Sequence, residues 1–188
     1  MKRKTLLLFI FALGLFLRLI LLEKIPAGVT DDQAALGYNA YLIAQTGKDE
    51  WGIRFPFQFR SFGDWKLPVY IYLSSIFFTF FPLSIFWTKI TSVLLGALTI
   101  ILIYYFVLLF FQGEKQKDKI ALLSALLLAL NPWHIGLSRT ASEANIGLFF
   151  FILALYFLKY FFKNSKKLYL LLSLIFGIVC FYSYHAYR

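Results

Sequence analysis

The chain has 188 residues, of which 61% are hydrophobic and 15% are charged, and its formal net charge is +10. Soluble domains average about 25% charged residues, so this composition excludes a water-soluble fold and favours a protein embedded in a bilayer. The net charge does not indicate a nucleic-acid partner, because no basic stripe alternates with solvent-facing aromatic residues and lysines at a cytoplasmic membrane boundary explain it better.

Long apolar runs are the main structural signal, since a helix needs about 20 such residues to cross the hydrocarbon. Five runs qualify, at residues 5–22, 86–111, 120–137, 146–162 and 168–184. The first could be a signal peptide, but no small-x-small cleavage site follows it, so we expect an uncleaved span. The single cysteine, Cys180, excludes a disulfide within this sequence. We therefore predict an all-α polytopic membrane protein with five transmembrane helices.

A sixth apolar run, residues 67–81, is short for a span, and its placement decides the orientation of every later helix. If it stays on one side, the basic N-terminus and the lysines of residues 115–119 and 159–167 all face the cytoplasm, as the positive-inside rule requires. If it crosses, those lysines face outward. We choose the first arrangement, with a long external loop over residues 23–85 that carries interfacial helices in contact with membrane lipids.

Two adjacent carboxylates, Asp31 and Asp32, lie in the stretch "GVTDDQAALGYNAY", just before a helix that we expect over residues 33–46. They could simply cap that helix, because negative charge at a helix N-terminus is favourable. Alternatively, one of them could be a general base at the membrane surface, where partial desolvation raises a carboxylate pKa. The doublet alone does not decide between these roles.

The block "FGDWKLPVYIYL" places Lys66 shortly before Pro68, which can begin a helix. Lys66 could anchor the chain at the interface, or it could bind a phosphate together with the helix N-terminus.

In the second outer loop, Arg139 and Glu143 are four residues apart and could pair, or both could line a pocket. His134 is expected to be an interfacial hydrogen-bonding group, because only one other histidine is available for a zinc site.

Four blocks occur together in one order: "DDQAALGYNA", "SFGDWKLPVYIYL", "NPWHIGLSRTASEANIGLFF" and "YSYHAYR". The chain thereby resembles the N-terminal part of GT-C membrane glycosyltransferases, specifically the superfamily of dolichyl-phosphate-mannose protein mannosyltransferases and aminoarabinose transferases. Bacterial members read roughly "WDEAA-GYDA", "SFGDYKPPLYIYL", "SPWHLHFSRIAFEANLALFF" and "YTYHSAR". Two departures are Gln33, where the family has Glu, and Leu67, where it has the first proline.

The resemblance implies an inverting transfer from a polyprenyl-phosphate-linked sugar to a hydroxyl acceptor at the outer face of a bacterial plasma membrane. It implies Asp32 as the catalytic base, with Asp31 as the runner-up, and Glu143 as the acidic residue of the second loop. Lys66, Arg139 and Arg188 become the expected donor-phosphate contacts. No cofactor is certain, although Asp32 and Glu143 could hold a divalent metal. Residues 1–188 are then expected to be the N-terminal part of a longer transmembrane domain.

Two other classes of function stay open at this point. A transporter would fit the hydropathy, but transporters usually place ionisable groups at mid-membrane, whereas here they lie near the ends of the spans. A non-catalytic scaffold subunit of the same fold is the other alternative, which Gln33 could favour.

Overall fold

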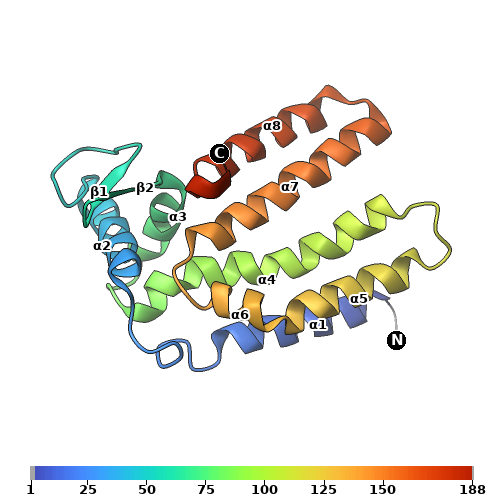
Figure 1. Cartoon of the computed structure of the whole chain (residues 1–188), viewed down its shortest axis with the longest axis horizontal. Coiled ribbons are helices and arrows are strands. Elements are labelled where there is room, and N and C mark those ends of the chain that lie inside the picture. The colour runs from blue at the N-terminus through green and yellow to red at the C-terminus, as the bar shows by residue number, and fades with distance from the viewer. Residues whose placement is uncertain (1–2, 188) are drawn as a thin grey trace.

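The computed structural model describes residues 3–187, so Arg188 lies outside the described residues. Its elements, in chain order, are α1 (Arg3–Leu19), α2 (Asp31–Thr46), β1 (Phe59–Ser61), β2 (Asp64–Lys66), α3 (Pro68–Phe78), α4 (Ile85–Phe110), α5 (Lys117–Leu130), α6 (Pro132–Ser138), α7 (Glu143–Asn164), α8 (Lys167–Phe181) and the 3-10 turn η1 (His185–Tyr187). Figure 1 shows α1, α4, α5, α7 and α8 running side by side, with α2, α3 and the two strands gathered at one end.

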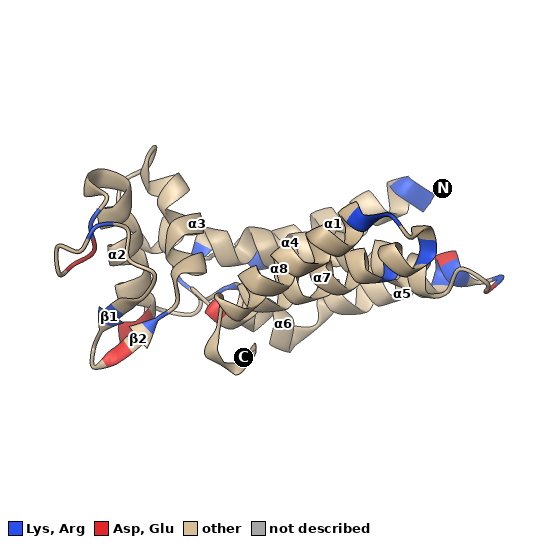
Figure 2. Ribbon diagram, turned by 90° about the horizontal axis from the view of Figure 1, so that it is seen from above, with Lys and Arg blue, Asp and Glu red and all other residues tan. Residues whose placement is uncertain are grey.

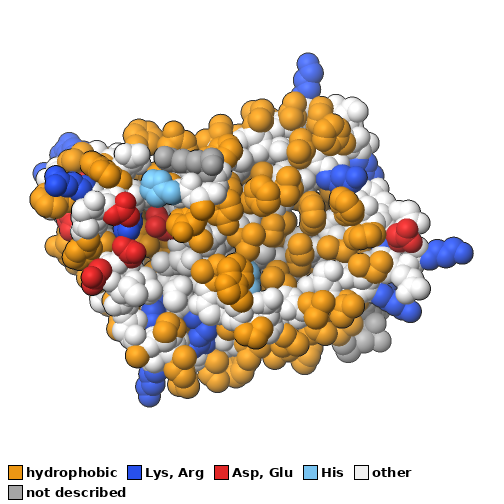
Figure 3. Space-filling view, viewed as in Figure 1, with side chains coloured by type: hydrophobic (Ala, Val, Ile, Leu, Met, Phe, Trp, Pro, Cys, Tyr) orange, Lys and Arg blue, Asp and Glu red, His pale blue; other side chains and the backbone are white. Residues whose placement is uncertain are grey.

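Charge and hydrophobicity are distributed as a bilayer requires. Large apolar side chains such as Leu8, Leu127 and Leu174 are more than half exposed on the helical bundle. Figure 3 shows hydrophobic side chains spread over the bundle, and Figure 2 shows charged residues concentrated toward its two ends. Burying such a surface in lipid removes the cost of exposing it to water. The chain is therefore an integral membrane protein.

Each of the five predicted spans forms mostly helix, but they differ in length. Helices α4 and α7 are long and apolar enough to cross a membrane, and α5 and α6 would make a third span if counted together. Helix α1 has 17 residues and α8 has 15, fewer than the roughly 20 that a straight crossing needs. The structure thus has two or three candidate spans among residues 3–187. The prediction of five spans is not confirmed.

The predicted helix over residues 120–137 is wrong in one respect, because it bends by 60° between α5 and α6. Pro132 cannot donate a backbone hydrogen bond, and Asn131 before it is extended. The side chain of Asn131 accepts from the His134 N–H and so caps α6. The bend leaves the carbonyls of Leu128 and Ala129 free to accept from the guanidinium of the fully buried Arg18, on α1.

The all-α prediction misses a short hairpin between α2 and α3. Strands β1 and β2 are antiparallel, with Ser61 opposite Asp64. The two turn residues, Phe62 and Gly63, both have positive φ angles, of 48° and 79°, as a two-residue type I′ turn requires. Because β2 ends at Lys66 and α3 begins at Pro68, the hairpin fixes where Lys66 lies relative to α3.

Helix α3 has 11 residues, too few for a straight crossing of a bilayer, which is consistent with the interfacial position predicted for residues 67–81. Its buried face, with Tyr70 and Ile71, packs in one core cluster with Leu36 of α2 and Ile146 of α7. Helix α2 approaches α4 closely at Gly37, where a Cβ would lie 2.4 Å from the Thr88 hydroxyl oxygen. Helices α2 and α3 are therefore packed firmly over the ends of α4 and α7.

Candidate active site

Thr30, not an aspartate, caps the N-terminus of α2. Its hydroxyl oxygen accepts from the Gln33 N–H at 3.4 Å, and Asp31 and Asp32 are the first two residues of the helix. The helix therefore begins two residues earlier than predicted, and the capping role considered for the doublet is wrong. Both carboxylates still lie in the first turn, where the helix dipole favours negative charge. That leaves their side chains free for other contacts.

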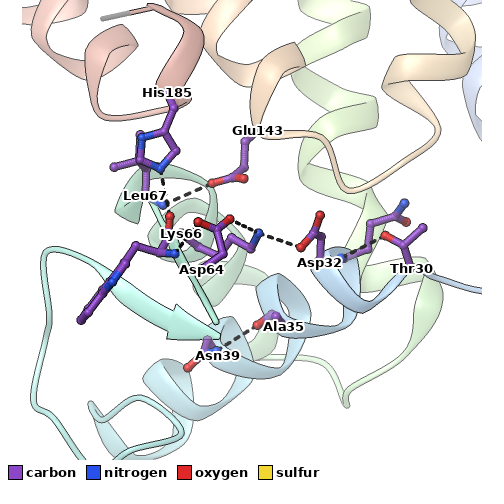
Figure 4. Close-up of polar contacts among 11 residues, drawn as sticks. Thr30, Asp32, Ala35, Asn39, Asp64, Lys66, Leu67, Glu143 and His185 are labelled. Carbon is purple, nitrogen blue, oxygen red and sulfur yellow. Dashed lines mark hydrogen bonds and ion pairs between the residues drawn. The ribbon is translucent and has the colours of Figure 1, made fainter. Parts of the chain in front are cut away.

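Lys66 joins two of the candidate site segments (Figure 4). Its ammonium nitrogen lies 2.7 Å from Oδ1 of Asp32 and 2.9 Å from Oδ2 of Asp64. The Lys66 side chain is only 7% exposed, whereas the side chains of Asp32 and Asp64 are 68% and 63% exposed. Among residues 3–187, Asp31 forms no ion pair. The structure thus brings Asp32, and not its neighbour, to the lysine.

The two aspartates decide the charge state of Lys66. Burial alone would lower the pKa of Lys66, but its hydrogen bonds to Asp32 and Asp64 and their negative charges outweigh burial and raise that pKa. The hydrogen bond from Lys66, together with the one from the Trp65 N–H, lowers the pKa of the Asp64 carboxyl. Lys66 is therefore a cation, and Asp64 an anion, over a wide pH range.

Glu143 lies at the same corner of the molecule. It is the first residue of α7, whose N-terminus is capped by Ser142, and its Oε1 accepts from the Leu67 N–H at 3.3 Å. Leu67 directly follows Lys66, so the Glu143 carboxylate lies near the lysine in space (Figure 4). The prediction that Glu143 and Lys66 border one site is consistent with this geometry.

Two further residues at this corner were absent from the sequence-based set. Asp64 pairs with Lys66, and His185 Nε2 lies 2.9 Å from the Trp65 carbonyl oxygen, which the ring N–H can contact as a donor. Both stand inside the blocks "SFGDWKLPVYIYL" and "YSYHAYR", so the blocks themselves held the signal. Pairing across 120 positions, as between His185 and Trp65, has no local sequence pattern.

The Arg139 guanidinium is directed away from Glu143, so the pair considered as one alternative does not form, and a shared pocket edge for the two residues stays a prediction. The guanidinium donates to the carbonyls of Leu17 at 2.8 Å and Ile25 at 2.7 Å. The buried Lys89 of α4 donates to the Pro26 carbonyl in the same segment at 3.1 Å. These two cations therefore hold the chain between α1 and Thr30. A contact between Arg139 and donor phosphate stays a prediction.

The acidic corner does not by itself form a metal cage. Within residues 3–187, no group of three or more His, Cys, Asp or Glu side chains is arranged to hold an ion. The Lys66 ammonium lies between Asp32 and Asp64 instead. What the arrangement offers is a buried cation for an anionic group, flanked by carboxylates that can accept protons.

Comparison with known proteins identifies the family. Residues 66–186 match the family described as dolichyl-phosphate-mannose-protein mannosyltransferase, which covers more than half of the chain and includes Lys66, Glu143 and His185. Searches of curated proteins and of solved structures found no match. Asp31 and Asp32 precede the matched region. The extent of the match and the membrane-type fold together show that the chain belongs to the dolichyl-phosphate-mannose-protein mannosyltransferase family of membrane glycosyltransferases.

Proposed function

We propose that this chain carries the donor-binding and catalytic corner of an inverting glycosyltransferase that uses a polyprenyl-phosphate-linked sugar. The observation that supports it most is Lys66, a buried cation held between the exposed carboxylates of Asp32 and Asp64. A cation of this kind suits a phosphate, and a carboxylate beside it suits a proton acceptor. The family description makes a dolichyl-type mannose donor and a protein hydroxyl the first substrates to test.

In the proposed reaction, the acceptor hydroxyl oxygen attacks the anomeric carbon of the sugar from the face opposite the phosphate. The bond between that carbon and the phosphate oxygen breaks, and its electron pair leaves with the polyprenyl phosphate. Asp32 takes the hydroxyl proton as the new bond forms. Lys66 stabilises the negative charge that develops on the departing phosphate.

Lys66 has to exchange partners for this to work. Without a donor, its ammonium is shared between Asp32 and Asp64. A bound phosphate would compete for the same ammonium and free Asp32 to face the acceptor. Glu143, which is partly buried beside Leu67, would orient the acceptor. Asp32 and Glu143 remain the candidate ligands if the full protein uses a divalent metal.

We also propose that this corner faces the outside of the membrane and that the chain crosses it five times. The lysines of residues 115–119 and 159–167 lie at the opposite end of the bundle from Asp32 and Asp64 (Figure 2). The positive-inside rule then assigns those lysines to the cytoplasm. For α1 and α8 to cross, the segments that flank them must lie within the membrane interfaces.

The test is sugar transfer by the full-length protein in membrane vesicles, supplied with polyprenyl-phosphate mannose and a hydroxyl-bearing acceptor peptide. Asp32→Asn should lower the turnover at least ~100-fold, the usual cost of losing a general base, while donor binding is largely retained. Asp31→Asn is the matched control, because it removes the same charge one residue away, and it should cost much less. Normal turnover in both variants would overturn the proposed base, and loss in Asp31→Asn alone would transfer the role to Asp31.

A further inference from the structure

The end of the bundle away from Asp32 and Lys66 is strongly basic. Helices α4 and α7 end there and α5 and α8 begin there (Figure 1). The lysines of these helix ends and their connections are Lys115, Lys117, Lys119, Lys159, Lys163, Lys166 and Lys167. The acidic residues of the same connections are Glu114 and Asp118. This end therefore carries a large excess of positive charge.

The few acids do not neutralise these lysines. The carboxylate of Asp118 lies 2.8 Å from Nη1 of Arg3, so its charge is already compensated. Within residues 3–187, no lysine at this end lies within ion-pair distance of a carboxylate. Lys159 instead places its ammonium 5.2 Å from the ring centroid of Phe110. A cation over an aromatic ring keeps its need for an anion.

Two adjoining pockets open among these lysines. One, of about 280 Å³, lies between the last turns of α4 and α7 and is lined by Lys159, Phe162 and Gly113. The other, of about 260 Å³, reaches the first turn of α5 and is lined by Lys117, Tyr156, Tyr160 and Asp118, whose carboxylate is paired with Arg3. Leu109, Gln112 and Lys163 line both pockets. A single ligand can therefore lie across the pair and contact lysines from two helices, α5 and α7.

The lining combines ammonium groups with apolar walls. Phe110 and Phe162 are more than half exposed beside the pockets, and Lys159 and Lys163 flank Phe162 in the last turns of α7. A soluble anion needs only the lysines. A phospholipid needs both, because its phosphate sits at the headgroup level while its acyl chains continue into the hydrocarbon. Basic pockets between membrane helices bind anionic headgroups in this way.

We propose that the paired pockets at the ends of α4 and α7 bind an anionic phospholipid of the surrounding bilayer. Lys159 and Lys163 donate to its phosphate, and Phe110 and Phe162 contact its acyl chains. The bound lipid neutralises cations that the chain leaves unpaired and joins the ends of α4, α5 and α7. The site is separate from the Asp32–Lys66 corner and does not depend on the proposed transferase function.

The experiment measures phosphatidylglycerol binding to the full-length protein by native mass spectrometry, with phosphatidylcholine as the zwitterionic comparison. Lys159→Gln combined with Lys163→Gln should weaken phosphatidylglycerol binding by about tenfold or more, from roughly a kcal/mol per lysine near a membrane surface. The matched control, Lys166→Gln with Lys167→Gln, removes the same charge from the same end but no pocket residue. Because these two lysines line neither pocket, their replacement should weaken binding clearly less than replacement of the pocket pair.

Three results would overturn the proposal. Equal weakening in the pocket pair and the control pair would show a general surface-charge effect. Equal binding of phosphatidylcholine by the wild type would show that the net negative charge of the lipid is not recognised. Glycerol 1-phosphate binding as tightly as phosphatidylglycerol would make the site one for soluble phosphates. Lys159→Arg with Lys163→Arg should retain binding, which separates loss of charge from loss of fold.

Discussion

The ammonium nitrogen of Lys66 lies 2.7 Å from a carboxylate oxygen of Asp32, although the two residues are 34 positions apart in the chain. This contact ties the first turn of α2 to the end of the β-hairpin. Since the lysine is buried and the carboxylate is open, an incoming anion has to reach Lys66 from the side on which Asp32 and Asp64 lie.

Replacement of Lys66 should therefore weaken donor binding more than it lowers the stability of the fold. Lys66→Ala should lose about 1.5–3 kcal/mol of donor binding, the range for hydrogen bonds to charged groups, and Lys66→Arg should retain part of it. The measurement is the dissociation constant of polyprenyl phosphate for the full-length protein. An unchanged constant in Lys66→Ala would leave Lys66 as a structural link between α2 and the hairpin.

The hairpin should be sensitive to acid through Asp64. The pKa of Asp64 lies below its ordinary value of 3.8 because of its hydrogen bonds from Lys66 and Trp65. A depressed carboxyl pKa gives stability that is present above the unfolded pKa and is lost as the pH falls through the folded value. The raised pKa of Lys66 contributes stability at lower pH instead. That stability is lost only at alkaline pH, above the ordinary lysine pKa of 10.5. Thermal unfolding between pH 2 and 5 should depend less on pH in Asp64→Asn than in the wild type.

Glu143 should matter for transfer without being required for folding. Glu143→Gln keeps an oxygen that can accept from the Leu67 N–H, so α3 should stay in place. Loss of the carboxylate should lower turnover by roughly tenfold, less than the ~100-fold or more expected for a general base, because Glu143 is proposed to orient the acceptor. Because Arg139 points to Leu17 and Ile25 instead, the exchange Arg139→Glu with Glu143→Arg should not restore activity. Restored transfer would show that the two residues pair during turnover.

Arg139 should be needed to hold the segment that leads to α2. Arg139→Ala removes donors to the carbonyls of Leu17 and Ile25, which should cost about 1.5–3 kcal/mol of stability for hydrogen bonds to a charged group. The matched control is the surface residue Arg54, whose replacement by Ala should cost less than ~0.5 kcal/mol. Thermal unfolding in detergent measures both. Equal losses of stability in the two variants would mean that the hydrogen bonds of Arg139 do not stabilise this segment.

The sequence was sufficient for features that depend on local composition. Apolar runs predicted most of each helix, and Pro68 marked the start of α3 because its missing N–H suits a first turn. The same reasoning could not show that residues 120–137 bend, since a proline can also be accommodated within a kinked span. It also could not anticipate the hairpin, because three-residue strands carry too little periodicity.

The residues of the site could be predicted from the sequence better than the contacts between them. Asp32, Lys66 and Glu143 were expected at one site, and the structure brings them to one corner. Spacing suggested an Arg139–Glu143 pair, but that rule holds only inside a helix, and Arg139 follows α6 while Glu143 begins α7. Arg139 therefore donates to the carbonyls of Leu17 and Ile25 instead. Only the tertiary fold brings these carbonyls within its reach.

The buried Arg18 has a consequence for how the protein is made. Within α1 its guanidinium can reach only the Gly14 carbonyl, and its other acceptors, on α5 and α6, lie more than 100 positions later. An arginine near the centre of an isolated inserting helix costs about 2.5–3.5 kcal/mol, and less near an end. The guanidinium therefore gains its remaining partners only after residues 128–138 are synthesised. Helix α1 cannot reach its final packing before the bent segment of α5 and α6 is present.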